Sequence, residues 1–184
     1  MHGLPLGHKW LVVAVLVRFS FTRRLWALPV PIALYHSEKE NSRRGRRHKT
    51  PTQLPRQLLR VLLRWFPQRQ FVCAADGDFA THDLARLASR YPQRLTYLRH
   101  FYADANLYEP APAEEVKQAK HRQRLNVAWY GGGRRDVEVV TGTAHWYEAG
   151  ASLAAVLWVW VHDCTGTHRD EYFFTTDGAG RRRR

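Results

Sequence analysis

The chain has 184 residues, of which 45% are hydrophobic and 12% aromatic, so it carries enough apolar material for a core, which excludes wholesale disorder. Twenty-nine Lys and Arg oppose sixteen Asp and Glu, which gives a net charge of +13 and a pI near 10.4. This balance favours nucleic acid as a partner, with anionic lipid or an acidic protein as the alternatives. The two cysteines, Cys73 and Cys164, are too few for a disulfide framework, and we expect both to be small buried residues.

Two strands are predicted first along the chain. Trp10–Phe19 is rich in valine and shows no alternation, which is typical of a strand covered on both faces. Its apolar part ends at Arg18, far short of the roughly 20 residues of a membrane helix, so we expect a cytoplasmic protein without a membrane partner. Leu25–Tyr35 is the second strand, and its prolines Pro29 and Pro31 predict an edge position or a bulge.

A basic loop and a helix follow. Glu38–Lys49 reads as a polar loop that contains SRRGRRHK. Thr50 is suited to capping the next helix, which Pro67 ends. The pattern predicts an exposed face with the arginines Arg56, Arg60 and Arg64. The apolar residues of the inward face are Leu54, Leu58, Val61, Leu62 and Trp65.

The next three elements alternate between strand and helix. Phe71–Ala75 is predicted as a short strand, Thr81–Arg90 as a helix with Leu84, Leu87 and Ala88 inward, and Leu95–Phe101 as a strand. Together with the preceding elements this order indicates an α/β sheet. We assign residues 1–104 to a first domain.

The second half has a different character. Glu109–Arg124 is polar and reads as a linker. Four aromatic and β-branched runs then predict an antiparallel sheet over 105–180, namely Val127–Tyr130, Asp136–Thr143, Ala154–His162 and Glu171–Thr175. Arg181–Arg184 is expected to be a solvated basic tail, which forms the third segment of the chain, 181–184.

Asp76 is the candidate catalytic residue. It follows a buried strand and precedes a glycine and a helix, and ligands collect outside the carboxyl ends of strands in open α/β sheets. A carboxylate at this position can bind Mg²⁺, although one aspartate alone cannot build a metal site. The alternative is an ordinary Asp-Gly turn, with Asp78 and Asp83 capping the next helix.

The basic loop is the candidate DNA-binding segment. Clustered guanidinium groups pair well with phosphates, so we expect phosphate contacts from Arg43, Arg44, Arg46, Arg47 and Lys49. The alternative is a solvated loop that only confers charge.

Several segments together resemble the catalytic region of DDE-type transposases from bacterial insertion sequences. The matching pieces run in family order and cover nearly the whole chain: GHKWLVV, LPVPIALY, HKTPTQLPRQLL, RWFPQRQFVCAADGDFA, LTYLRHFYADANLY, WYGGGRRDVEVVTGTAHWY and VWVHDCTGTHRDEYFFTTD. The resemblance implies a ribonuclease-H-like mixed sheet with a β-rich insertion, and an enzyme that cuts and joins DNA at element ends with Mg²⁺. It places Asp76 as the second carboxylate of the acidic triad and a metal ligand.

The family's other two carboxylates do not fall within the matching segments. Its first aspartate lies upstream of GHKWLVV, on the central strand of the sheet, and its glutamate lies downstream of FFTTD. We therefore expect a transposase fragment without its first strand, marginally stable and inactive alone, acting near the bacterial nucleoid. Its expected partners are DNA and an intact transposase or a second copy. The alternative function is a non-catalytic DNA-binding protein or a regulator of an intact transposase.

Overall fold

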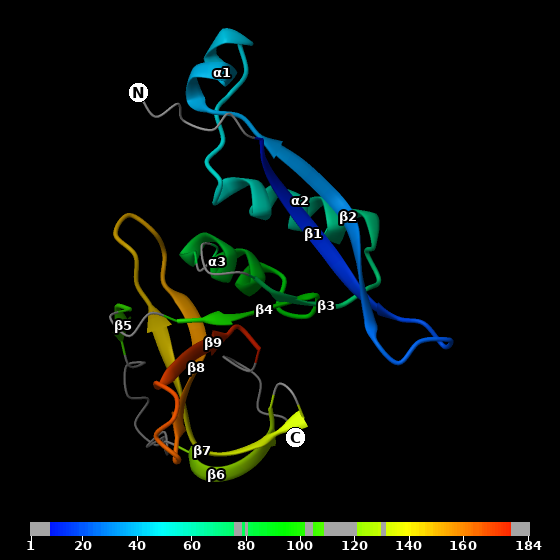
Figure 1. Ribbon diagram of the computed structural model, residues 1–184. Helices are drawn as coiled ribbons and strands as arrows, with labels where there is room; N and C mark the ends of the chain where they lie inside the picture. Colours follow the sequence, from blue (N-terminus) through cyan, green and yellow to red (C-terminus); the bar gives the residue numbers. More distant parts are fainter. Residues whose placement is uncertain are drawn as a thin grey trace, which may run out of the picture. The chain divides into compact units, whose positions relative to one another are not determined.

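The computed structural model describes residues 8–75, 79, 81–101, 105–108, 121–129 and 132–177. These residues form an α/β structure with a mixed sheet (Figure 1). The chain divides into two compact units, Met1–Arg69 and Gln70–Arg184, which we describe separately as unit 1 and unit 2. In the part of the chain that is described, no helix is long and apolar enough to cross a membrane.

Unit 1 is built on a long antiparallel hairpin. Strand β1 (Lys9–Arg18) pairs with β2 (Leu25–Tyr35). The register shifts between Val12 and Ala14, and Ala14 lies opposite Pro29. The predicted edge position and bulge of the proline-containing strand are therefore confirmed, because a residue without an amide N–H fits neither a central ladder nor a regular one.

The prediction that the first strand is covered on both faces is wrong for the described residues. Burial alternates along β1, and Trp10, Val12 and Leu16 are 59%, 49% and 64% exposed. Helix α2 (Gln53–Trp65) packs on the hairpin, and side chains of a strand point alternately to opposite faces. A uniformly apolar run hides this difference, because both faces carry the same residue types.

The segment predicted as a basic loop begins with a helix, α1 (Glu38–Arg43). The Ser37 side chain accepts a hydrogen bond from the backbone amide of Glu40 at 3.3 Å. Gly45 ends the helix in the left-handed region, with a φ of 61°. The S-x-x-E signature of a capping box explains why these six residues are helical rather than irregular.

Helix α2 begins at Gln53, after Thr52, whose side chain makes no capping hydrogen bond, but the capping contacts predicted for Thr50 form two residues earlier. The Thr50 hydroxyl accepts a hydrogen bond from the Gln53 amide at 3.2 Å, and the Gln53 side chain accepts one from the Thr50 amide at 3.3 Å. The inward face is rotated from the expected one, because Trp65 is 56% exposed whereas the buried positions are Pro55, Leu58, Leu59, Leu62 and Leu63. Pro67 follows the end of the helix as predicted.

Unit 2 is one seven-stranded sheet with a single helix among its described residues. Its elements are β3 (Phe71–Ala74), α3 (His82–Arg90), β4 (Leu95–His100), β5 (Leu107–Tyr108), β6 (His121–Ala128), β7 (Arg134–Trp146), β8 (Ala154–Asp163) and β9 (Glu171–Thr175). The order is β3-β4-β9-β8-β7-β5, with β6 also paired to β7. Only β3 and β4 run parallel among the described pairs, and the long strands β7 and β6 curl (Figure 1).

The core of unit 2 lies where α3 packs on the sheet. Leu84, Leu87 and Ala88 are buried as predicted, and α3 contacts β4 and β8. Phe174 on β9 is fully buried, and its ring centroid lies 5.2 Å from that of Trp146. This contact joins strands that are far apart in the sequence.

Three expectations need correction. The predicted linker Glu109–Arg124 ends within a strand, because β6 begins at His121 and pairs along β7. Cys164 is exposed, since it lies in the turn after β8. The first-half strands do not form one sheet, because β9 pairs with β4 while β1 and β2 form a sheet of their own. The domain boundary after residue 104 stays a prediction from the sequence, since the division after Arg69 separates compact units and does not test it.

Candidate nucleic-acid interface and carboxylate position

Asp76 lies outside the described residues, as does Asp78. The flanking elements define the surroundings of this position along the chain. The carboxyl ends of β3 and β4 lie at the same edge of the sheet because the two strands are parallel, with Ala74 opposite Leu98. Asp76 follows β3 by two positions, so the sequence-based placement of a carboxylate after this strand stays a prediction.

A buried tyrosine anchors the chain just after this position. The hydroxyl of Tyr97, which lies fully buried on β4, donates a hydrogen bond to the backbone carbonyl of Phe79. Burial raises the pKa of Tyr97 above its ordinary range, and the nearby Cys73 adds to this effect. The tyrosine therefore remains a hydrogen-bond donor at neutral pH and holds the backbone of Phe79 beside β4.

His82 is a second anchor at the start of α3, and the sequence did not single it out. Its buried ring places Nε2 at 3.1 Å from the backbone carbonyl of Trp146, so Nε2 carries the proton. Its Nδ1 lies 3.4 Å from a carboxylate oxygen of Glu148, which is itself exposed. The hydrogen bond to the Trp146 carbonyl and the edge-on packing of the His82 and Trp146 rings fix the start of α3 against the end of β7.

A pocket of unit 2 lies at the opposite end of the parallel strands. It has a volume of about 530 Å³ and is lined by residues at the amino ends of β3 and β4, together with Asp177. Among the described residues, no three His, Cys, Asp or Glu side chains are grouped so that they could hold a metal ion. The residues present therefore do not complete a Mg²⁺ site in the described part of the chain.

The basic loop of unit 1 is an ordered turn. Buried Asn41 donates a hydrogen bond to the carbonyl of His36 at 3.0 Å and lies 3.2 Å from Nδ1 of His48. The Arg46 amide donates to the Asn41 carbonyl at 2.9 Å. Together with Gly45 these contacts fix the backbone, so the turn presents its charged side chains from a defined scaffold.

The structure distinguishes among the five predicted DNA-binding residues. The side chains of Arg43, Arg46 and Arg47 are exposed. Arg44 instead pairs with Glu40, its Nε at 2.6 Å from the carboxylate. Lys49 donates a hydrogen bond to Gln57 of α2, which brings its ammonium group beside that helix.

Helix α2 extends the basic surface. Arg60 and Arg64 are exposed, one turn apart, and α2 contains no acidic residue. Like charges at this spacing destabilise a helix in isolation, and a polyanion relieves the repulsion. The predicted arginine face is thus confirmed at these two positions, whereas Arg56 is half-buried.

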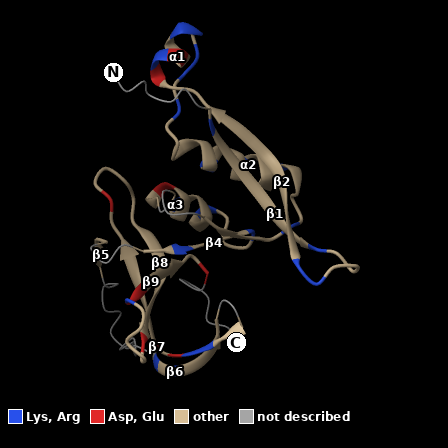
Figure 2. Ribbon diagram, in the orientation of Figure 1, with Lys and Arg blue, Asp and Glu red and all other residues tan. Residues whose placement is uncertain are grey.

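The positive charge is concentrated in unit 1. Residues 1–69 contain 14 Lys and Arg against 2 Glu, a net charge of +12. Residues 70–184 contain 15 Lys and Arg against 14 Asp and Glu, a net charge of +1. Figure 2 shows Lys and Arg on α1 and at the turn between β1 and β2. Almost the whole net charge of the chain therefore belongs to its first compact unit.

Acidic side chains of unit 2 are engaged within the unit. Asp163 is buried, which alone raises its pKa, but hydrogen bonds from the side chains of Thr167 and Thr165 and from backbone amides outweigh burial and hold its pKa well below the usual range. Arg135 lies 3.3 Å from the same carboxylate, and its guanidinium sits 3.9 Å from the ring centre of Trp129. This cluster fixes the β8–β9 turn and provides hydrogen-bond donors to both oxygens of Asp163.

A second carboxylate, that of Asp170 just before β9, is hydrogen-bonded to side chains of β8. His162 Nδ1 lies 2.7 Å from Asp170, and the Trp160 indole donates to the same carboxylate at 2.9 Å. The His162 hydrogen bond is the main reason why the pKa of Asp170 is lowered.

No protein-family model, curated protein or solved structure matches the chain.

Proposed function

We propose that this chain is part of a DDE-class DNA transposase, that unit 1 binds DNA, and that Asp76 is one of the carboxylates for Mg²⁺. The observation that carries the proposal is the net charge of +12 on residues 1–69. A polycation of this density attracts the phosphates of DNA, and binding is driven by release of their counterions. The family resemblance of the segments around Asp76 supplies the catalytic part of the proposal.

The exposed guanidinium groups are the proposed phosphate contacts. Arg43, Arg46 and Arg47 project from a turn that Asn41 and Gly45 hold in place, so their binding costs little ordering of the backbone. Arg44 already has an acidic partner, so we expect it to contribute less than its neighbours. Lys49 extends the contact toward Arg60 and Arg64 on α2.

The chain on its own is expected to bind DNA without cutting it. A carboxylate at position 76 is a suitable ligand for Mg²⁺, but the described residues offer no grouped set of further ligands. A second candidate function follows from the same observation: a DNA-binding regulator would compete with an intact transposase for the element ends.

The first experiment measures binding of the full chain to a 30-base-pair duplex by fluorescence anisotropy across a range of KCl concentrations. Each lost phosphate contact lowers the slope of log K against log salt by about 0.9. The triple variant Arg43→Gln, Arg46→Gln, Arg47→Gln should therefore lower that slope by about 2.7. The matched control removes three exposed arginines of unit 2, Arg90→Gln, Arg124→Gln and Arg169→Gln, and should change the slope little.

Equal losses from the two triple variants would refute the assignment of DNA binding to unit 1. A cleavage lane with Mg²⁺ tests the catalytic part, with Asp76→Ala as its control. Cleavage that depends on Asp76 would show that a complete metal site assembles in this chain. Inhibition of an intact transposase by the chain, without cleavage, would favour the regulator.

A further inference from the structure

The turn between β1 and β2 displays aromatic side chains to solvent. Phe21 is 79% exposed and Trp26 is 52% exposed. Phe19 lies beside them, with its ring centroid 5.2 Å from that of Phe21 and an angle of 19° between the rings. Trp26 approaches Phe19 edge-on at 6.4 Å. Exposed aromatic clusters of this kind mark interaction sites, because their hydration is unfavourable.

The turn holds these rings in an ordered arrangement. The Thr22 amide donates to the Phe19 carbonyl at 3.1 Å, and the Thr22 hydroxyl donates to the Arg24 carbonyl at 2.9 Å. The first hydrogen bond closes the backbone around Phe21, and the second closes it around Arg23. The ring is therefore presented on a defined turn rather than on a flexible tip.

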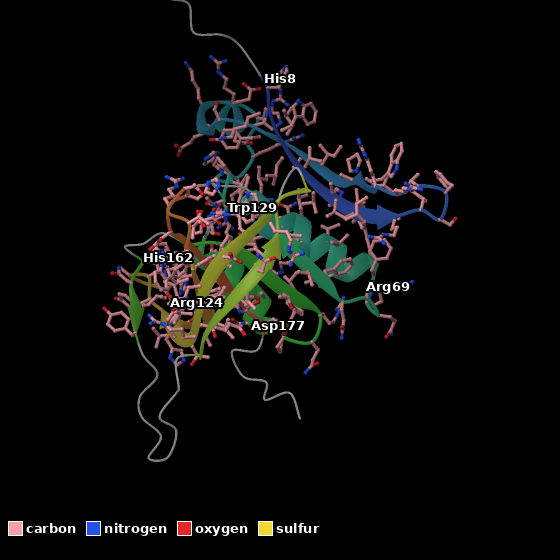
Figure 3. All side chains as sticks on the ribbon, turned by 60° about the horizontal axis from the view of Figure 1, so that its bottom comes forward. His8, Arg69, Arg124, Trp129, His162 and Asp177 are labelled. Atoms are coloured by element: carbon pink, nitrogen blue, oxygen red, sulfur yellow. The ribbon has the colours of Figure 1, made fainter. Side chains whose placement is uncertain are left out.

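Three arginines surround the aromatic cluster. Arg18, Arg23 and Arg24 are all exposed, and no ion pair involves them among the described residues. The hairpin from residue 8 to residue 35 contains no Asp or Glu. Figure 2 shows the Lys and Arg colour at this turn, and in Figure 3 the side chains at the end of the hairpin away from His8 project outward.

We propose that this hairpin turn, residues 18–26, binds unpaired nucleotides of a DNA strand. Phe21 stacks on a base, while Arg23 and Arg24 contact the adjoining phosphates. The proposal rests on the proposed DNA binding by unit 1 and adds a second contact of a different kind. Aromatic rings need the faces of bases, which a duplex hides by its own stacking, so the ligand is single-stranded rather than double-stranded.

Charge favours nucleic acid over the other polyanion, an anionic membrane. The turn belongs to a unit whose charge is spread over the hairpin, α1 and α2, which suits an extended phosphate backbone. Planar guanidinium groups also pair bidentately with phosphates and stack on bases. The aromatic rings and the arginines together match the two parts of a nucleotide.

The test measures binding of the full chain to a 20-nucleotide oligothymidine and to a 20-base-pair duplex by fluorescence anisotropy. Phe21→Ala should weaken oligothymidine binding by about 5- to 150-fold, the effect of losing one stacked base, and leave duplex binding unchanged. Phe21→Trp should restore it. The matched control is Leu16→Ala, which truncates a side chain that is 64% exposed on the same hairpin and should have no effect.

The arginines give a second, independent reading. Arg23→Gln with Arg24→Gln should lower the salt slope for oligothymidine by about 1.4, that is, about 0.7 for each phosphate contact on a single strand. Equal effects of Phe21→Ala and Leu16→Ala, or an equal loss for duplex and single strand, would overturn the stacking contact. If Phe21→Ala instead abolished binding to phosphatidylglycerol vesicles and left oligothymidine binding intact, the turn would be a membrane contact and the nucleotide proposal would be overturned.

The two proposals fail in different ways. If the chain binds neither DNA probe, the proposed function itself fails. If duplex binding depends on Arg43, Arg46 and Arg47 while oligothymidine binding does not depend on Phe21, only the hairpin proposal fails.

Discussion

Gly142 lies where the sheet of unit 2 tolerates no side chain. It pairs with Trp158 across β7 and β8, and a Cβ at this position would lie 2.6 Å from Cζ2 and 2.7 Å from Cε2 of that indole. Carbon atoms in contact prefer about 3.5–4.0 Å, so the Gly142→Ala variant forces a displacement of about 1 Å. Both atoms belong to a rigid ring, which must swing as a whole or push the strands apart.

The magnitude follows from the balance of two effects. Overpacking a close contact costs about 1–3 kcal/mol. Replacing glycine by alanine also restricts the unfolded chain, which stabilises the fold by about 0.4–1 kcal/mol. Gly133 provides the matched control, because a Cβ there meets no atom within 4 Å and its φ is not in the left-handed region. The difference between the two variants isolates the contact with Trp158 and should be about 1–3 kcal/mol.

Urea unfolding monitored by far-ultraviolet circular dichroism measures this difference. Gly142→Ala should unfold at a lower urea concentration than Gly133→Ala, with unchanged dependence on urea. Equal midpoints for the two variants would show that the β7–β8 pairing over Gly142 is wrong or that the indole moves at no cost. A Gly142→Ala and Trp158→Leu double variant should recover most of the loss.

Two further predictions concern titratable groups of unit 2. His162 lowers the pKa of Asp170 in the folded protein, so the carboxylate stabilises the fold above its unfolded pKa of about 3.9, and this contribution is lost as the pH falls through the lower folded value. Thermal melts between pH 6 and pH 2 should therefore show a smaller decline in Tm for Asp170→Asn than for the unaltered chain, and parallel curves would contradict this. Cys164 is exposed, whereas burial raises the pKa of Cys73 to about 11. A disulfide reagent at pH 8 should therefore react with one thiol in a fast phase that Cys164→Ser removes, and a fast phase that survives this change would contradict the assignment.

Local signals predicted most elements of this chain. Glu171–Thr175 and Ala154–His162 were readable because aromatic and β-branched runs stand between turns, and Thr50 because it precedes an amphipathic run. The helix after Ser37 was not predicted although its capping signature is local, because the many arginines that follow are typical of a solvated loop. The first half of β6 was missed because an edge strand exposed to solvent carries polar residues.

Long-range pairing was beyond local signals. β9 inserts beside β4, with Phe173 opposite His100, and no pattern within either strand specifies its partner. The candidate site shows the same limit. The charge of each segment is readable from the sequence, but the concentration of +12 appears only once the unit boundary after Arg69 is known. Asp76 remains a prediction from its position after a strand and from family resemblance.

The prolines of β2 control how the hairpin can associate. Pro29 and Pro31 have no amide N–H, and such residues belong at edges where no further strand pairs. β1 contains no proline between Lys9 and Arg18, and among the described residues only β2 pairs with it. The hairpin therefore has one receptive edge and one refractory edge. We therefore expect a further strand to pair along β1 rather than along β2, which limits growth of this sheet to one side.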